Sequence, residues 1–382
     1  MWVQLFIFII AFIGLNLYPE RGDEYQQQQA RKKYIILIMA LLALQSGLRH
    51  LAVGTDTFAY YREFNSIKNS SFNEMLTSFV TFVKTDTGGK DPGYRIFQYL
   101  FATIIPSFRI YLIAIAVFVF TALGRLLYRY TDSNKEVLVA VALYQCLFYS
   151  FFSITGLRQT IATGFLLFAV PYVFDKRWTK ALILIALAAT QHKSALLFVP
   201  FCALPYVKKT GTLLVISFIT FIPMWKMGGA IAKFFMAGTR FEQYMAYLNA
   251  YEGAGAYNFT AFIIFFCVCL LFKYRRVNEC GEYSYVFVNA TAVALALTPL
   301  TMIDPSNMRI VQYYSIFSLI SLPQFLTVFR RDNLATDVHM LVFLILGTFT
   351  LISNHADYGF FWQEMRLNEN YGTTTVFKEE LF

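Results

Sequence analysis

The chain is poor in charge: Asp, Glu, Lys and Arg together make up 14% of its 382 residues, and only 4 residues are His. Soluble globular domains carry about a quarter charged residues. Together with 57% hydrophobic residues and a mean hydropathy of +0.51, this composition excludes an ordinary soluble domain and predicts a polytopic membrane protein. The net charge of +9 is therefore interpreted as positive loops on the inner side of a membrane, plus cations for an anionic substrate. It does not indicate a nucleic-acid partner.

Several catalytic patterns are missing as well. The sequence has no Asp-x-Asp, His-x-x-x-His or Glu-x-x-His, so it predicts neither a bound catalytic metal nor a cofactor. A glycine-rich phosphate loop and the Gly-x-Ser-x-Gly nucleophile pattern are also missing. The five cysteines include no Cys-x-x-Cys pair and lie mostly inside apolar runs. We interpret them as small buried hydrophobic residues.

Long apolar runs are what the sequence has instead. We expect an all-α integral membrane protein, a helical bundle of about 12 spans in which residues 1–353 form one transmembrane domain. The run 94–106 is too short to cross and is predicted to be a re-entrant or interfacial helix. The run 179–206 is broken by the polar residues 191–193, which allows one kinked helix or two short ones. Runs of spanning or near-spanning length cover residues 2–18, 33–51, 110–128, 137–155, 159–174, 211–226, 257–273, 283–303, 310–329 and 337–353.

Lys and Arg clusters predict the orientation, because they favour the cytoplasmic side of a membrane. All of them lie inside only if 94–106 does not cross and 179–206 crosses twice. Both termini are then extracytoplasmic, with external loops at about 52–109 and 227–256 and an extracytoplasmic interfacial tail at 354–382. The basic clusters lie within residues 21–33, 125–135, 176–180, 208–209, 273–276 and 330–331.

Four short polar islands lie on the same predicted outer side. The first, residues 49–61, contains Arg49, Asp56 and Tyr60, and its Gly-Thr-Asp sequence predicts a tight turn that holds the Asp56 carboxylate near Arg49. Because one topology places all four islands in one compartment, we expect them to form one site. The other three islands are residues 156–159, 191–194 and 304–309.

Two arginines are candidate diphosphate ligands. Arg158 and Arg309 each start a predicted helix, and Gln159 adds a neutral donor beside Arg158. A planar guanidinium makes paired charge-assisted hydrogen bonds, and a helix N-terminus adds its dipole and free amides. The alternative is that these arginines only bind ordinary lipid phosphate at the interface. Tyr60 and Tyr94 are candidates for stacking on sugar faces.

His192 is the candidate general base, since it sits at the break of an apolar run and imidazole accepts protons near neutral pH. The alternative is a hydrogen-bonded residue at a helix end. The neighbouring Lys193 is expected to disfavour imidazolium and to keep the ring basic. Asp56 is the second candidate base; if it is paired with Arg49, it is the weaker base and orients the acceptor or Arg49 instead.

Six short motifs, taken in their order along the chain, resemble the EpsG branch of the Wzy-type polysaccharide polymerases. Asp91 departs from that pattern, in which glutamate is expected to be common. The motifs that carry the resemblance are Arg49…Gly54-Thr55-Asp56…Tyr60, Asp91-Pro92-Gly93-Tyr94, Gly156-Leu157-Arg158-Gln159, His192-Lys193-Ser194-Ala195, Arg309-Ile310-Val311-Gln312-Tyr313-Tyr314 and Leu322-Pro323.

The resemblance implies a metal-independent glycosyltransferase of the bacterial plasma membrane. Such an enzyme joins undecaprenyl-diphosphate-linked oligosaccharide units outside the cytoplasm, to make a capsule, O-antigen or exopolysaccharide. The implied fold is all-helical and similar to the GT-C lipid-sugar glycosyltransferases and O-antigen ligases. The implied partners are membrane lipid and the chain-length regulator and flippase of the same pathway, with no nucleic acid.

Two other classes of function stay open at this point. A lipid-linked oligosaccharide flippase also needs cations and aromatic rings, although transporters usually show internal pseudo-symmetry and polar groups near the membrane midplane. A membrane sugar O-acyltransferase also uses a histidine or carboxylate but need not hold a diphosphate. The position of the polar islands at one face favours the polymerase.

Overall fold

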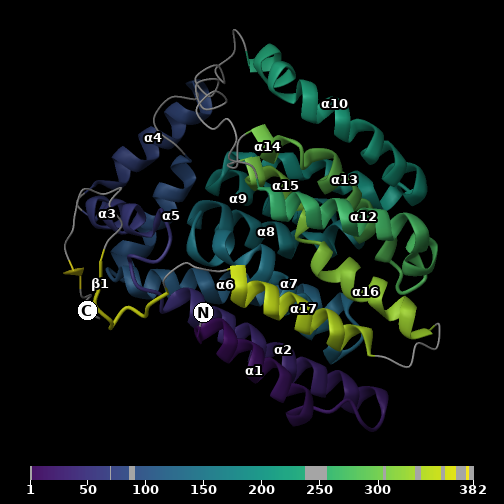
Figure 1. Cartoon of the computed structure of the whole chain (residues 1–382). Coiled ribbons are helices and arrows are strands. Elements are labelled where there is room, and N and C mark those ends of the chain that lie inside the picture. The colour runs from purple at the N-terminus through teal and green to yellow at the C-terminus, as the bar shows by residue number, and fades with distance from the viewer. Residues whose placement is uncertain are drawn as a thin grey trace. The chain divides into compact units, whose positions relative to one another are not determined.

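A computed structural model describes residues 2–68, 70–85, 91–236, 256–303, 307–331, 337–353, 358–366 and 376–377 (Figure 1). In this part of the chain the structure is helical apart from one pair of two-residue strands. The chain divides into two compact units. The first unit contains Met1–Tyr172, Arg177–Lys193 and Met340–Phe382, and the second contains Val173–Lys176 and Ser194–His339.

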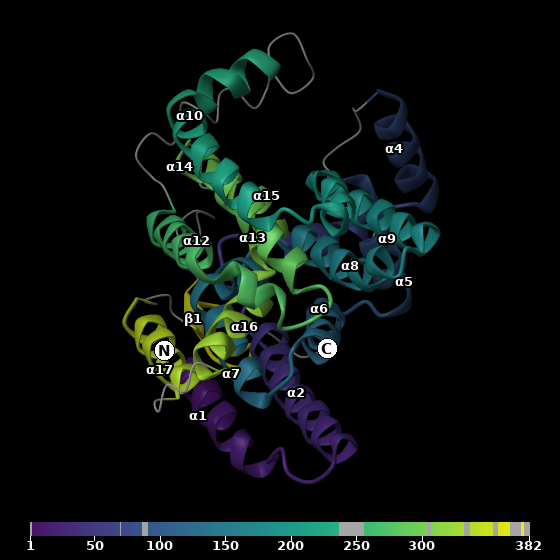
Figure 2. The same cartoon turned by 90° about the vertical axis from the view of Figure 1, so that its right-hand side faces the viewer.

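The first unit is built from helices of both ends of the chain. In Figures 1 and 2, α17 (yellow) lies beside α1 (purple), and Phe8 packs edge-on against Phe343 with the ring centroids 5.8 Å apart. The elements that lie wholly or mainly in this unit are α1 (Trp2–Leu17), α2 (Glu24–Gly47), α3 (Thr57–Ile67), α4 (Phe72–Thr85), α5 (Pro92–Ile104), α6 (Phe108–Tyr130), α7 (Asn134–Leu147), the π-helix η1 (Tyr149–Ile154), α8 (Leu157–Phe174), α9 (Trp178–Gln191), α17 (Val338–Ser353), β1 (Met365–Arg366) and β2 (Val376–Phe377).

The second unit has an aromatic core. Phe201 stacks on Phe198 at 4.5 Å and on Phe317 at 4.7 Å, which joins η2 to the turn between α15 and α16. Its elements are the 3₁₀ helix η2 (Lys193–Tyr206), α10 (Thr210–Met236), α12 (Tyr257–Asn278), α13 (Ser284–Leu297), α14 (Leu300–Ile303), α15 (Met308–Ser315) and α16 (Ser318–Arg331).

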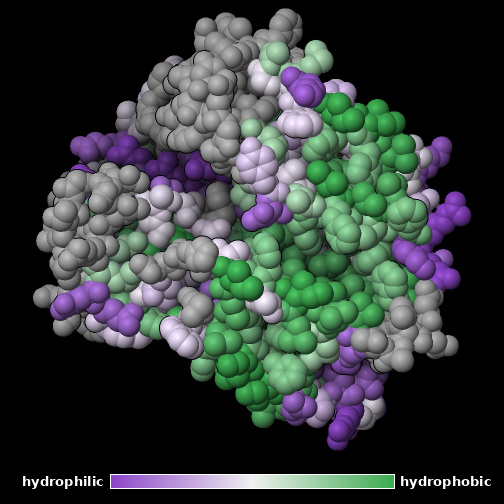
Figure 3. Space-filling view, viewed as in Figure 1, coloured by the Kyte–Doolittle hydropathy of each residue, from purple (hydrophilic) through white to green (hydrophobic). Residues whose placement is uncertain are grey.

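The helices confirm a polytopic helical membrane protein. Within the described ranges, five helices are long and apolar enough to cross a membrane, and five more are apolar but shorter. Their outer faces are hydrophobic: α12 exposes Phe265 and Phe272, α17 exposes Leu344 and Ile345, and both helices present green surface in Figure 3. The total of about 12 spans and the direction in which each span crosses stay predictions. The long candidates are Phe108–Tyr130, Leu157–Phe174, Thr210–Ala230, Tyr257–Asn278 and Ser284–Met302.

Two irregular stretches of the sequence fold as their composition predicts. The stretch 94–106 lies largely within α5, whose 13 residues span about 20 Å, less than the ~30 Å of a bilayer core. The stretch 179–206 divides at His192, where the backbone is extended between α9 and η2. The polar residues therefore mark a real break between two helices.

Other boundaries differ from the expected ones. The apolar stretch 137–155 is divided between α7 and the π-helix η1. The predicted external loop at 227–256 is partly helical, because α10 continues to Met236. The remaining loop residues 237–255 lie outside the described part of the chain. The apolar residues of a loop-like stretch can extend a helix, and hydropathy alone does not fix the last turn.

A short piece of the tail pairs with the loop that follows α2. Phe361 N donates to Leu48 O at 3.0 Å, and His50 N donates to Gly359 O at 2.8 Å. The Tyr358 hydroxyl donates to Gln45 O near the end of α2. These contacts hold residues 358–361 against the first polar island.

Candidate functional site

Asp91 is the centre of a polar network in the first unit. It directly precedes α5 in the left-handed region, with φ 47° and ψ 62°. Pro92 opens the helix, where a proline costs no hydrogen bond. Gly93 lies against the end of α9, because a Cβ at that position would meet the Thr190 carbonyl oxygen at 2.5 Å. This close approach brings the carboxylate of Asp91 to the break at His192.

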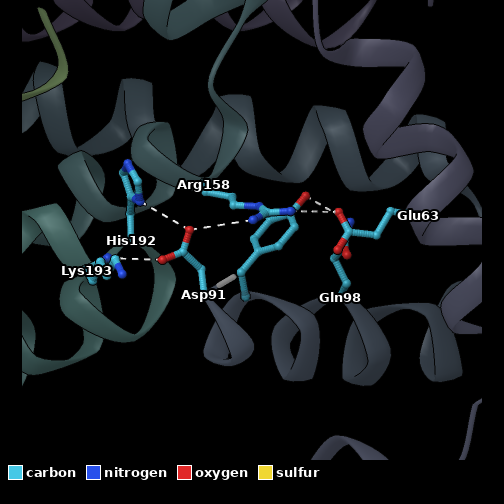
Figure 4. A network of polar contacts seen from close by, with 7 residues as sticks. Glu63, Asp91, Gln98, Arg158, His192 and Lys193 are labelled. Carbon is cyan, nitrogen blue, oxygen red and sulfur yellow. Dashed lines mark hydrogen bonds and ion pairs between the residues drawn. The ribbon is translucent and has the colours of Figure 1, made fainter. Parts of the chain in front are cut away.

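Three groups contact the Asp91 carboxylate, which is only 6% exposed (Figure 4). His192 Nδ1 lies 3.2 Å from Oδ2, the Lys193 amide donates to Oδ1 at 3.2 Å, and Arg158 Nη1 lies 3.6 Å from Oδ2. Burial by itself raises the pKa of Asp91. The hydrogen bond and charge of His192, with the Lys193 amide and Arg158, outweigh burial and hold the pKa below its usual value.

The state of Asp91 determines which nitrogen of His192 is protonated. An ionised carboxylate only accepts hydrogen bonds, so His192 Nδ1 must carry the proton in this contact. In neutral imidazole the other nitrogen, Nε2, then has the free lone pair. A carboxylate that fixes the tautomer of a histidine in this way is the arrangement in which imidazole acts as a general base.

Arg158 connects the network to α3. It is the second residue of α8, as the sequence predicts, and its Nη2 makes an ion pair with Glu63 Oε2 at 3.1 Å. Its guanidinium carbon lies 5.1 Å from the ring centroid of Tyr94 and 5.7 Å from that of Tyr60. The side chain is 18% exposed. Arg158 therefore has a carboxylate beside each of its Nη atoms, and its guanidinium carbon lies over two tyrosine rings.

Tyr60 and Tyr94 meet each other as well as Arg158. Their ring centroids are 5.8 Å apart in an edge-on contact, and the Tyr94 hydroxyl accepts from Gln98 Nε2 at 2.8 Å. Tyr94 is fully buried, so its ring forms a wall under Arg158 and is closed to a sugar. Tyr60 is half-buried and stays a candidate for sugar contact.

Arg49 is buried in the same unit, at 1% exposure. The hydrogen bonds described for it run to Ser46 and, from Nε at 3.4 Å, to Thr57 Oγ1. Thr57 in turn donates to Ile154 O at 3.0 Å. These contacts hold the loop between α2 and α3 against η1, and no described contact joins Arg49 to Asp56.

Asp56 directly precedes α3 and makes no side-chain cap for it. It comes four residues before Tyr60 and seven before Glu63, so helical periodicity places all three on one face of α3. Asp56 thus stands one turn from Tyr60, toward the N-terminus of the helix.

Gln159 and Arg309 complete the predicted set. Gln159 follows Arg158 in α8 and is buried. Arg309 is the second residue of α15, at a helix start as predicted, but it belongs to the second unit. Residues 304–306 of its polar island lie outside the described part of the chain. The first unit by itself brings together Tyr60, Tyr94, Arg158, His192 and Lys193.

Sequence reasoning missed two acidic residues of this network. Glu63 was not singled out, although its spacing from Asp56 and Tyr60 puts it on their helix face. Asp91 was noted only as part of a motif, where a glutamate is expected. Among the described residues, no group of three or more His, Cys, Asp and Glu is placed to hold a metal ion.

Comparison with known proteins gives one match. No curated protein and no solved structure matches the chain. The sequence model of the EpsG family matches residues 32–365, which include every residue of the network and nearly the whole helical part. The chain therefore belongs to the EpsG family, a family of Wzy-type polysaccharide polymerases.

Proposed function

We propose that this polymerase transfers an oligosaccharide from a polyprenyl diphosphate to the hydroxyl of another lipid-linked unit, with Arg158 holding the diphosphate and His192 taking the proton. The observation that carries the proposal is the contact of Asp91 with both His192 and Arg158. The Asp91 carboxylate thus contacts both a proton acceptor, His192, and a guanidinium, that of Arg158.

Each side chain has a distinct task in this reaction. The acceptor oxygen attacks the anomeric carbon while the bond from that carbon to the diphosphate oxygen breaks. The acceptor proton goes to His192 Nε2, and Asp91 stabilises the resulting imidazolium through Nδ1. The diphosphate leaves with its negative charge compensated by Arg158 and Lys193. Asp91 orients His192, a role that the sequence prediction gave to no residue. Asp56, one turn from Tyr60 toward the start of α3, keeps its predicted role of orienting the acceptor sugar.

The proposal includes the side of the membrane and the absence of a metal requirement. The distribution of basic loops supports a network that faces the outer side of a bacterial plasma membrane, where lipid-linked units are displayed. Single cysteines at Thr55 and Lys193 should react with an impermeant maleimide added outside intact cells, and one at Lys209 only after permeabilisation. If positions 55 and 193 were labelled from opposite sides, the two segments would face different compartments and the proposed site would be wrong.

Deletion of the gene separates the candidate functions. Loss of a polymerase leaves single repeat units on the lipid and on the surface, whereas loss of a flippase leaves no units outside. Loss of an O-acyltransferase leaves polymer of normal length that lacks acyl groups. The proposal predicts single units, with long polymer restored by the wild-type chain and not by Arg158→Gln. Normal polymer length in the deletion strain would overturn it.

A further inference from the structure

The guanidinium of Arg158 is already occupied by protein carboxylates. Glu63 Oε2 lies 3.1 Å from Nη2, and Asp91 Oδ2 lies 3.6 Å from Nη1. A diphosphate that binds the Nη atoms of this guanidinium has to compete with one of these carboxylates for its N–H groups, because a third anion beside them is repelled. The question is which carboxylate leaves.

The two carboxylates differ in how firmly they are held. Asp91 is almost buried and accepts from His192 and the Lys193 amide in addition to its contact with Arg158. The Glu63 side chain is 26% exposed, and the contact described for its carboxylate is with Arg158. Glu63 also lines a surface hollow along α3 together with Tyr61 and Arg62, which gives its side chain room outside the network. Glu63 is therefore the exchangeable partner.

We infer that Glu63 is a competing anion that binds Arg158 in the absence of substrate, yields it to the diphosphate, and returns to it as the polyprenyl diphosphate product leaves. This inference rests on the proposed function, because a diphosphate at Arg158 is the ligand that Glu63 competes with. It assigns to Glu63 a role in substrate and product affinity and none in proton transfer.

The charges of the network agree with such an exchange. With His192 neutral, Arg158 and Lys193 balance Asp91 and Glu63. A diphosphate carries at least two negative charges, so its binding is favoured when one carboxylate withdraws. Outside the binding event, Glu63 keeps Nη2 of Arg158 paired while Asp91 contacts Nη1, so both Nη atoms of this partly buried cation have an anionic partner.

Aromatic contacts allow Arg158 to stay in place while its partner changes. The rings of Tyr94 and Tyr60 lie 5.1 and 5.7 Å from the guanidinium carbon, and Tyr94 is itself fixed by Gln98. Cation–π contact does not use the N–H groups of the fork. Contact with the two rings thus helps to position the guanidinium, while its N–H groups stay able to exchange one anion for another.

Lipid affinity of the full chain in nanodiscs tests the inference. The variant Glu63→Gln keeps the size of the side chain and removes its charge, so undecaprenyl diphosphate should bind roughly three- to tenfold tighter than to the wild type. Both KM and kcat should fall, because the product leaves more slowly. Glu63→Asp keeps the charge and should bind close to wild type. Glu74→Gln, the same change at an exposed carboxylate of α4, should bind as the wild type does.

The outcomes separate this inference from the function on which it rests. If Arg158→Gln abolishes binding while Glu63→Gln binds no tighter than wild type, Glu63 only positions Arg158 and the inference is wrong, although the proposed function stands. Equal tightening by Glu63→Asp and Glu63→Gln would also overturn it, since charge would then not matter. If Arg158→Gln binds undecaprenyl diphosphate as tightly as wild type, it is the proposed function that fails.

Discussion

Arg109 and Arg158 occupy the same position in two helices and have different surroundings. Each is the second residue of a helix long and apolar enough to span a membrane. Arg109 is 4% exposed, donates to Gly47 O at 2.9 Å and to Arg49 O at 2.6 Å, and lies 4.7 Å from the ring centroid of Phe361. Arg158 instead contacts two carboxylates and two tyrosine rings.

The difference separates an arginine that serves the fold from the one that we propose to bind a ligand. Carbonyl oxygens at the end of α2 lack partners within their helix, and Arg109 supplies the donors that they need. It has a fixed structural task. Of the two carboxylates beside Arg158, that of Glu63 has no described contact with a backbone group, and we propose that another anion can take its place. The chemical nature of the partners therefore separates the two arginines, whereas their places in the sequence do not.

The largest expected effect comes from the histidine beside Arg158. His192→Ala should lower turnover roughly 10²- to 10⁴-fold while lipid-linked substrate still binds, because the acceptor hydroxyl loses its base. Asp56→Asn should chiefly weaken binding of the acceptor. Single-turnover kinetics with purified protein measure both. Unchanged turnover of His192→Ala together with an inactive Asp56→Asn would reverse the two roles.

Arg158→Lys should lower activity by about 10- to 100-fold at normal abundance, because an ammonium keeps the charge but cannot make the paired bonds of the guanidinium. Arg109→Lys is the matched control, with the same change at the same position of another helix, and should retain activity per folded molecule. Polymer length and in vitro transfer report the result. Similar activity losses in the two variants would remove the distinction drawn above.

The opposite pattern is expected for stability. Arg109→Met should reduce the free energy of unfolding by about 1–3 kcal/mol, because the carbonyls of Gly47 and Arg49 lose their donor. Arg158→Met should change stability less, since its carboxylate partners keep access to solvent or to other donors. Thermal unfolding in nanodiscs measures both. A larger loss for Arg158→Met would show that its network is structural.

A smaller effect concerns acid stability. The folded-state pKa of Asp91 lies below the usual value of 3.8, so its ionised form stabilises the fold above about pH 4. That contribution is lost as the pH falls through the lowered pKa. Asp91→Asn should be less stable than wild type at neutral pH, and the gap should close below about pH 4. A gap that stays constant down to pH 2 would mean that the ionic contacts of Asp91 add no stability.

Chelation is expected to have the smallest effect. EDTA should leave transfer by the purified protein unchanged, because the carboxylates near Arg158 are paired with cationic and amide groups. Among the described residues, no group of acidic side chains is placed to hold a metal ion. Loss of activity in EDTA and its recovery with Mg²⁺ or Mn²⁺ would make Asp56, Glu63 or Asp91 a metal ligand. Arg158 would then share its neighbours with an ion.

The sequence predicted the parts of the site that depend on local signals. The break at His192, the short helix that follows Asp91 and the helix start at Arg158 all follow from polar residues at the ends of apolar runs. The contact between Asp91 and His192 depends on the packing of α5 against α9, over about a hundred residues of chain, and hydropathy carries no information on it. Glu63 was missed for the same reason.

Arg49 shows why closeness in sequence misled the prediction. Its nearest carboxylate along the chain is Asp56, which suggested an ion pair. The described hydrogen bonds go instead to Ser46 and Thr57. Carbonyl groups of a helix C-terminus need donors wherever a long helix ends inside a protein. The prediction counted formal charges and left out these backbone acceptors.

The pairing of residues 359–361 with 48–50 has a consequence for biosynthesis. The ribosome makes the second segment about 310 residues after the first, which takes roughly 15 to 60 s at 5–20 residues per second. The whole second unit emerges in that interval. The backbone groups of Leu48 and His50 can therefore form these hydrogen bonds only after the last part of the chain has been made. A nascent chain that is released before residue 361 therefore contains every residue of the network but lacks the backbone partners of this loop.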